Sequence, residues 1–523
     1  MRNRRKMNEP KAAKQKVIDG CKEKACSDKE VKTMEACFGY LNCDCLMHIF
    51  SFLPIRDRVN VELVCKQWYS AGRELWKSFK QLDVCRSKWQ FKNLKKFKRV
   101  EMTMFKTVLE RCGRYLTEID FTHLSTIDEE IYFEYTIDDD KMHEDDDKSF
   151  EGIMALASNC TNIEKLSLSS TVVNCNDQHL LDIFKTNKKI RFLNLIGYGI
   201  HGTCFNGLSA HVIETLLMQY CCVQSKRLCK LLERCVNLNI LSLNCTRSFN
   251  TKNFGDILRC VSLVNIKSLK EFRFVSYYDN NRETHLYTSF HVNTNFKNLI
   301  AIQIMEAMED SMNDLLIALG KHCTNLRRAN FSDCVGVTDD ILINITTLPK
   351  LEVLCIDRME HVTDRSLICL SEHLKILKCS DSQISDTGVI TLLNKSQNIE
   401  ILNLSMCKNI SKRSVDYAIC VTKHRTNNII LNFCVDHYYG EKCNVKDKSP
   451  LFRLHYELTA KEEQLHTGRG CSYIYPFFKC EKNLLQKSCT FNIDSNTEKT
   501  FGSYAYYHFF MCFCQRIPND ENN

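Results

Sequence analysis

The sequence predicts an α/β fold in two parts, a short all-helical module followed by a curved solenoid of strand–helix repeats. A short apolar alternation recurs through residues 81–435, and an apolar segment with helical spacing precedes it over residues 36–80. The third observation is size. At 523 residues the chain exceeds one ordinary core, which favours several domains or a repeat array.

The repeats are clearest between residues 323 and 415. The alternating pairs there are Ala329/Phe331, Leu354/Ile356, Leu377/Cys379 and Leu402/Leu404, whose first members are 25, 23 and 25 residues apart. Further pairs occur at Leu82/Val84, Ile119/Phe121, Leu166/Leu168, Leu193/Leu195, Leu216/Met218, Leu241/Leu243, Phe272/Phe274, Ile302/Ile304 and Leu431/Phe433. Each pair places two apolar side chains on one face of a short strand, and a helical segment packs over them. Because one unit cannot bury this face alone, stacked units form a curved parallel sheet.

Cysteine and helix-capping residues recur at fixed places in these repeats. Cysteines precede or follow the predicted strands at Cys112, Cys160, Cys235, Cys323, Cys334 and Cys407. We expect them to pack as small buried hydrophobes between neighbouring repeats. A Val/Ile–Thr/Ser–Asp triplet opens the helices at 337–339, 362–364 and 384–386, where its oxygens can cap the first amides. The pattern resembles the cysteine-containing class of leucine-rich repeats.

The helical module reads LNCDCLMHIFSFLPIRDRVNVELVCKQWYSAGRELW over residues 41–76. Apolar residues share one face of a first helix that Pro54 ends, and a second helix follows. The order of these residues resembles an F-box, with Asn42 standing where the family usually has proline. The residues expected to bind a partner are Leu41, Leu46, Ile49, Phe50, Leu53, Pro54, Val64, Cys65, Trp68 and Trp76.

The resemblance implies a non-catalytic subunit of a Skp–cullin–F-box ubiquitin ligase. The F-box would bind the Skp adaptor, and through it the cullin–RING ligase, while the repeats would hold a protein substrate. No cofactor is implied. One alternative is a repeat scaffold or inhibitor without a ligase. Another is an enzyme with a metal site near the C-terminus.

Strand alternation also predicts which residues face away from the helices. These positions are mostly uncharged and polar, with a few charges that look isolated, while Ile196 and Leu217 could serve as apolar anchors. The residues expected to contact substrate are Phe192, Arg273, Met305, Arg328, Asp357 and Lys378. The other possibility is an ordinary solvated face.

Charge is spread unevenly along the chain. Residues 86–114 hold ten Lys/Arg and two Glu, and residues 118–147 hold thirteen Asp/Glu and one Lys. We expect a basic, disordered tail at 1–35 and an acidic insertion near 128–148 that screens the basic stretch or is simply solvated. Nucleic-acid binding is ranked below protein recognition, because it would use only the basic segments.

Whether the 31 cysteines form disulfides depends on the cellular compartment of the protein. Without a signal peptide, a lipidation motif or an apolar run long enough for a bilayer, the chain is expected in the cytosol or nucleus, off the membrane, with mostly free thiols. Residues 436–523 are rich in cysteine and aromatics and are not expected to continue the repeat. Lacking paired CxxC spacing, they favour a cap over a zinc site.

Overall fold

The computed structural model describes residues 41–83, 102–122, 151–169, 175–197, 199–245, 268–276, 294–305, 309–436 and 449–457. The chain divides into two compact units, Met1–Ser78 and Phe79–Asn523. The basic tail, the acidic insertion and the terminal cysteines from Cys471 onward lie outside the described residues, so those expectations remain predictions.

Over residues 41–78, which the structure describes, the first unit consists of three short helices and one turn of 3-10 helix: α2 (Cys43–Ser51), α3 (Ile55–Val61), α4 (Lys66–Leu75) and η1 (Trp76–Ser78). The side chain of Asn42 accepts a hydrogen bond from the Cys45 amide at 2.8 Å and so caps α2. The segment expected to form one second helix is two, because Pro54 starts α3 and Cys65 caps a separate α4.

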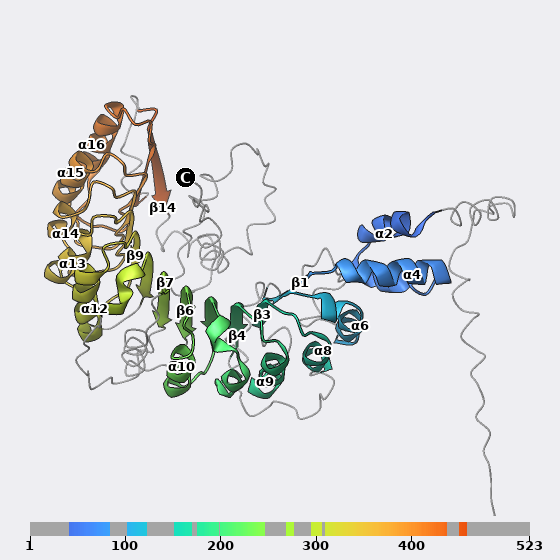
Figure 1. The fold of residues 1–523 in the computed structure, drawn as a ribbon. Helices are drawn as coiled ribbons and strands as arrows, with labels where there is room; N and C mark the ends of the chain where they lie inside the picture. Colours follow the sequence, from blue (N-terminus) through green and yellow to red (C-terminus); the bar gives the residue numbers. More distant parts are fainter. Residues whose placement is uncertain are drawn as a thin grey trace, which may run out of the picture. The chain divides into compact units, whose positions relative to one another are not determined.

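The described residues of the second unit form one parallel sheet of fourteen strands in sequence order. Figure 1 shows the strands following one another along the chain. The strands are β1 (Gln81–Asp83), β2 (Glu118–Phe121), β3 (Lys165–Ser169), β4 (Phe192–Ile196), β5 (Thr215–Gln219), β6 (Ile240–Cys245), β7 (Glu271–Ser276), β8 (Ala301–Met305), β9 (Arg328–Asn330), β10 (Val353–Cys355), β11 (Ile376–Lys378), β12 (Ile401–Asn403), β13 (Leu431–Asp436) and β14 (Phe452–Glu457). Every predicted alternating pair whose two members the structure describes lies on or directly beside a strand.

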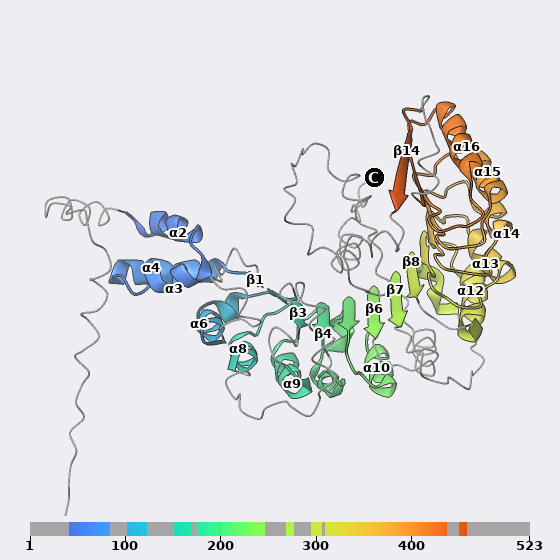
Figure 2. The same ribbon diagram turned by 180° about the vertical axis from the view of Figure 1, so that it is seen from behind.

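Helices cover one face of this sheet, as both ribbon views show (Figures 1 and 2). The α-helices are α6 (Met102–Cys112), α8 (Glu151–Asn159), α9 (Asp177–Thr186), α10 (Ser225–Leu232), α12 (Glu309–His322), α13 (Asp339–Thr346), α14 (Asp364–Ile368), α15 (Asp386–Lys395) and α16 (Lys412–Lys423). Several other connections are 3-10 helices: η2 (Gly113–Tyr115), η6 (Thr203–Gly207), η7 (Ala210–Val212) and η8 (Thr294–Asn298). The opposite surface of the sheet is called the strand face below.

The repeat core matches the predicted physics. Leu166, Leu193, Leu354, Leu377 and Leu402 are each 0% exposed. The six predicted ladder cysteines are buried free thiols. Several donate to a backbone carbonyl of a neighbouring repeat, such as Cys407 Sγ to Cys379 O at 3.1 Å. Burial raises the pKa of the Cys323 thiol to about 12, so these thiols stay protonated packing groups.

One boundary from the sequence was wrong. Residues 436–523 were expected not to continue the repeat, yet β14 pairs in parallel with β13 over six residues, from Leu431↔Phe452 to Asp436↔Glu457. Phe452 is buried and lies 6.0 Å from the Phe433 ring. The alternation Phe452/Leu454 is the sequence pattern of this additional strand, 21 residues after Leu431/Phe433.

Aspartates at the helix starts tie neighbouring repeats together. Asp339 accepts hydrogen bonds from Thr363 and Ser366, Asp364 from Ser385, and Asp386 from Ser411 and Ser414. The hydroxyls of Thr363 and Ser385 cap their own helices as predicted, whereas Thr338 makes no such bond. The Asp of the triplet therefore serves the next repeat rather than its own helix.

In the part of the chain that the structure describes, no helix is long and apolar enough to cross a membrane. Those same residues include no cluster of three or more His, Cys, Asp or Glu side chains able to hold a metal ion.

Candidate adaptor-docking surface and strand face

The first unit has its own small core. Leu46, Phe50, Val61, Ala71 and Leu75 are at most 8% exposed and pack together. Leu41, Leu53 and Trp68 pack against this core while remaining half-buried, with the Phe50 and Trp68 rings 5.1 Å apart.

Trp76 belongs to the inside of the unit. It is 1% exposed, and its Nε1 donates to the buried Glu62 carboxylate at 2.5 Å. Gly72 makes room for this contact, since a Cβ there would lie 3.0 Å from the Glu62 side chain. Three residues expected to bind the partner, Leu46, Phe50 and Trp76, are therefore wrongly assigned. They are fully enclosed by the unit's own helices and present no surface.

Other expected partner-binding residues are accessible. Ile49 is 46% exposed and Val64 61%, and Cys65 is exposed, while Pro54 is half-buried. Three further apolar side chains not predicted from the sequence are also exposed: Phe52, Leu63 and Tyr69, at 75%, 82% and 52%. In the sequence they are apolar residues that do not share the apolar face of either predicted helix. We call Ile49, Phe52, Leu63, Val64 and Tyr69 the docking residues.

The backbone that carries the docking residues is fixed by hydrogen bonds. Arg58 donates to the carbonyls of Leu53 at 2.7 Å and Ser51 at 2.5 Å, which satisfies the C-terminal end of α2. Gln67 on α4 donates to Leu41 O at 2.7 Å. A rigid backbone that exposes several large apolar side chains on a unit this small is typical of a protein-binding surface.

On the strand face, the predicted outward residues form continuous rows. The register aligns Asn194, Leu217 and Ser242 on β4–β6, and Arg273, Gln303, Asn330, Cys355, Lys378 and Asn403 on β7–β12. Three expected substrate residues flank this central row: Phe192 and Arg328 lie two residues before it on their strands, and Met305 lies two residues after it. These positions therefore share one surface.

The charges on this face are not isolated, contrary to the interpretation of the sequence. Glu271 binds Arg273 at 2.9 Å and Arg328 at 2.8 Å, and its own side chain is 4% exposed. Arg328 lies two strands away, and the residue between them in the register is Ala301. The small alanine side chain lets the carboxylate and the guanidinium meet across β8.

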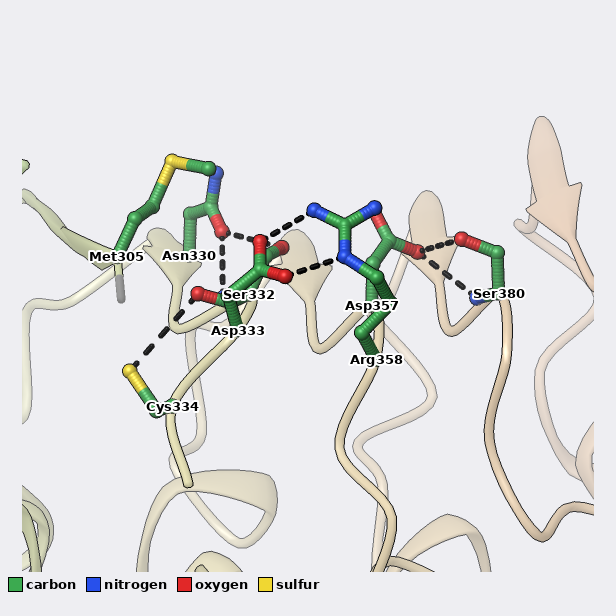
Figure 3. A network of polar contacts seen from close by, with 8 residues as sticks. All are labelled: Met305, Asn330, Ser332, Asp333, Cys334, Asp357, Arg358 and Ser380. Atoms are coloured by element: carbon green, nitrogen blue, oxygen red, sulfur yellow. Dashed lines mark hydrogen bonds and ion pairs between the residues drawn. The ribbon is translucent and has the colours of Figure 1, made fainter. Parts of the chain in front are cut away.

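A second polar network lies at the ends of β8–β11 (Figure 3). Arg358 makes a bidentate ion pair with Asp333, and Asp357 accepts from the Ser380 amide and hydroxyl at 2.8 and 2.7 Å. Burial raises the pKa of Asp357, opposed by the Ser380 hydrogen bonds and the charges of Lys378 and Arg358. Met305 is 3% exposed, and its sulfur accepts from Gln303 at 2.8 Å.

The backbone at these strand ends repeats as well. Asp333, Arg358, Asp381 and Met406 have φ of 61°, 58°, 51° and 63°, each at the same position of its repeat. Their amides donate to the following repeat where the structure shows a partner, as from Arg358 N to Ser380 O at 2.8 Å. The left-handed turn is thus required by the repeat itself, and the side chain at this position is free to vary.

Comparison with known proteins supports the prediction that the first unit resembles an F-box. Residues 43–81 match the model of the F-box-like family. No curated protein matches the chain. Among solved structures, the chain is similar to the crystal structure of the Rad7 and Elc1 complex in yeast, with 12% identity, 77% of this chain and 96% of that chain covered, and a TM-score of 0.44. It also resembles the complex of TLR13 with ssRNA13, with 15% identity, 64% and 51% covered, and a TM-score of 0.32.

The two structural likenesses are too distant to carry a functional argument. The family match and the geometry define the class: a repeat protein that joins an F-box-like helical domain to a parallel-strand solenoid. More particularly, the chain has the architecture of an F-box/leucine-rich-repeat protein.

Proposed function

We propose that this chain is the substrate-recognition subunit of a Skp–cullin–F-box ubiquitin ligase. The F-box-like domain binds the Skp adaptor, and the strand face of the repeats holds a target protein. The observation that carries the proposal is the set of docking residues, which leaves large apolar side chains exposed on a domain whose core is already complete.

The subunit itself performs no bond chemistry in this proposal. By holding the target near a charged ubiquitin-conjugating enzyme, it raises the effective concentration of a target lysine. The proposed place of action is the cytosol or nucleus.

Co-purification of the full chain with the Skp adaptor tests the docking half. A Phe52→Asp, Leu63→Asp double variant removes two exposed anchors without touching the core. Burying each side chain contributes roughly 1.5–3 kcal/mol, so we expect binding to fall by at least about a hundredfold. Leu53 and Trp68 are poorer choices, because both pack on the core and their loss would unfold the domain.

Lys77→Asp is the matched control, since it makes the same change in net charge at a residue that is 52% exposed in a surface pair with Glu74. We expect this variant to retain the adaptor. If the parent chain does not bind the adaptor, or the double variant binds as well as the control, the docking proposal is wrong and a scaffold without a ligase becomes the better account.

For the target-holding half, Phe192 is proposed as an apolar anchor and Arg273, Arg328, Asp357 and Lys378 as polar contacts. Met305, also expected as an anchor, is 3% exposed and presents too little surface for that role. Reversing the charge of Arg273 and Arg328 should abolish target capture while the adaptor still binds. Because Glu271 joins both arginines, the reversal must be accompanied by a check that the chain remains folded.

A further inference from the structure

The strand face is divided into two chemically different parts. From β7 to β11 it carries the Glu271, Arg273 and Arg328 cluster and the Asp333–Arg358 pair described above. From β3 to β6 the described strand-face positions are uncharged apart from Lys165, which pairs with Glu118 at 3.3 Å. The uncharged positions there are Ser167, Ser169, Phe192, Asn194, Ile196, Thr215, Leu217, Gln219, Ile240, Ser242 and Asn244.

Asn194 and Gln219 in the uncharged part each have a side-chain carbonyl without a hydrogen-bond donor. Asn194 on β4 is 3% exposed, and its Oδ1 is buried without a partner. On the adjacent strand β5, the Oε1 of Gln219 is likewise buried and unpartnered. A buried acceptor without a donor costs roughly 1–3 kcal/mol, so two of them on adjacent strands indicate a place for donors from a bound ligand.

The arrangement of the two amides indicates what could bind them. Ile196 pairs with Gln219 in the register, so Asn194 and Gln219 lie on the same surface, one strand and two residues apart. Strand spacing of about 4.8 Å and a rise of about 3.3 Å per residue separate their Cα atoms by roughly 8 Å. Amides pointing to the same side of an extended peptide recur every two residues, about 6.6 Å apart, within reach of both side chains.

The surroundings favour a neutral ligand over a charged one. Phe192 and Ile196 are half-buried and Leu217 is 9% exposed, so apolar side chains frame the two amides. A lysine or arginine bound there would lose water without meeting a carboxylate among the described residues of β3–β6, which is costly. A backbone N–H or an amide side chain needs only the acceptors present.

We propose that Asn194 and Gln219 form a peptide-reading site that holds an extended, uncharged segment of a partner protein through its backbone N–H groups. Phe192, Ile196 and Leu217 take the apolar side chains of that segment. The inference deepens the target-holding half of the proposed function and rests on it for the identity of the partner as a ligase target. The site itself does not depend on adaptor binding.

The first test needs no ligand. In Asn194→Leu, an apolar side chain of similar size replaces a buried amide without a partner for its carbonyl, so the midpoint of thermal unfolding, Tm, should stay the same or rise. The matched control is Asn187→Leu. Asn187 is 1% exposed, accepts from Ile163 N at 3.0 Å and donates to Cys160 O at 2.9 Å. We expect Asn187→Leu to lower Tm by about 5 °C or more. An equal fall in Asn194→Leu would show that Asn194 is structural and would overturn the proposal.

The second test uses a synthetic library of nine-residue peptides that contain no Asp, Glu, Lys or Arg, presented to the full chain. We expect selected peptides to bind Asn194→Leu and Gln219→Leu at least about tenfold more weakly than the parent. Binding should be unchanged in Lys185→Met, a control on the helix side of the sheet whose lysine is 57% exposed.

No enrichment on the parent chain, or equal binding to parent and Asn194→Leu, would overturn the inference. Crosslinks from a photoreactive residue at position 217 to the chain's own residues rather than to the peptide would also overturn it, because the occupant would then be intramolecular. A chain that fails adaptor co-purification yet passes both tests would lose the ligase role and keep the peptide site.

Discussion

Asp339 offers a sharp test of how neighbouring repeats are held together. Asp339 is 5% exposed, and its carboxylate accepts four hydrogen bonds from the next repeat. Two come from Thr363, from the amide at 3.0 Å and the hydroxyl at 2.6 Å, and two from Ser366, at 3.2 and 2.6 Å. Replacing Asp339 with alanine therefore leaves four donors at the start of α14 without their acceptor.

The magnitude can be worked from these contacts. A hydrogen bond to a charged group contributes roughly 1.5–3 kcal/mol, and bonds sharing one carboxylate are not additive. Since the exposed edge of α14 can recover some bonds with water, we expect Asp339→Ala to lower the free energy of unfolding by about 3–5 kcal/mol. Urea denaturation of the full chain, followed by far-UV circular dichroism, measures this loss.

Asp340 provides the matched control, because it is the adjacent residue and carries the same charge. Its side chain is 72% exposed and pairs with Arg365 at 2.8 Å, where the Arg365 side chain is 65% exposed. Solvent screening limits such a pair to about 0–1 kcal/mol. If Asp339→Ala loses no more stability than Asp340→Ala, the aspartate ladder does not hold the repeats together and the reasoning fails.

Three further predictions follow from the repeat contacts. Gly388→Ala should cost about 1–3 kcal/mol in urea denaturation, because a Cβ there would lie 2.2 Å from Asp364 Oδ1. Gly199→Ala, whose Cβ would meet nothing closer than 3.5 Å, should be nearly neutral, and equal effects would contradict the packing argument. Glu271→Ala should destabilise by about 3–5 kcal/mol, since two largely buried arginines lose the carboxylate they share. Glu352→Ala removes pairs with the more exposed Arg327 and Lys375 and should cost at most about 1 kcal/mol. A loss as large as that of Glu271→Ala would mean that burial does not strengthen these ion pairs. Finally, burial alone would raise the pKa of Asp386, but hydrogen bonds from Ser411 and Ser414 outweigh it and hold that pKa below its ordinary value of 3.8. The stability that ionised Asp386 contributes is therefore complete above about pH 4 and is lost as the pH falls through the lowered pKa. In thermal unfolding, the difference in stability between the parent and Asp386→Asn should become smaller in acid. A difference that is constant with pH would contradict this.

The strands could be predicted from the sequence because a period of two, repeated every 23 to 25 residues, is a direct consequence of stacking one buried face. Cysteine burial was predictable for the same reason. The Glu271 cluster was not, because it depends on the lateral register of three strands and on the small Ala301 between two of them. Periodicity within one strand does not contain that information.

In the helical unit at residues 41–78, the sequence does not reveal which apolar residues are buried. Its helices are apolar on more than one side, so helical spacing identifies apolar residues but not which of them the domain needs for itself. Leu46 and Phe50 face α4 and are enclosed, whereas Phe52 lies past the end of α2 and is exposed. Only the packing of the three helices separates the core residues from the docking residues.

Hydrogen exchange of the full chain with and without the Skp adaptor tests the central claim most directly. The account predicts that the adaptor slows exchange in residues 47–53 and 62–70, which carry the docking residues, and leaves the strands of 271–436 unchanged. Protection in the repeat strands without protection of the docking segments would contradict it, as would no change anywhere at a saturating concentration of the adaptor.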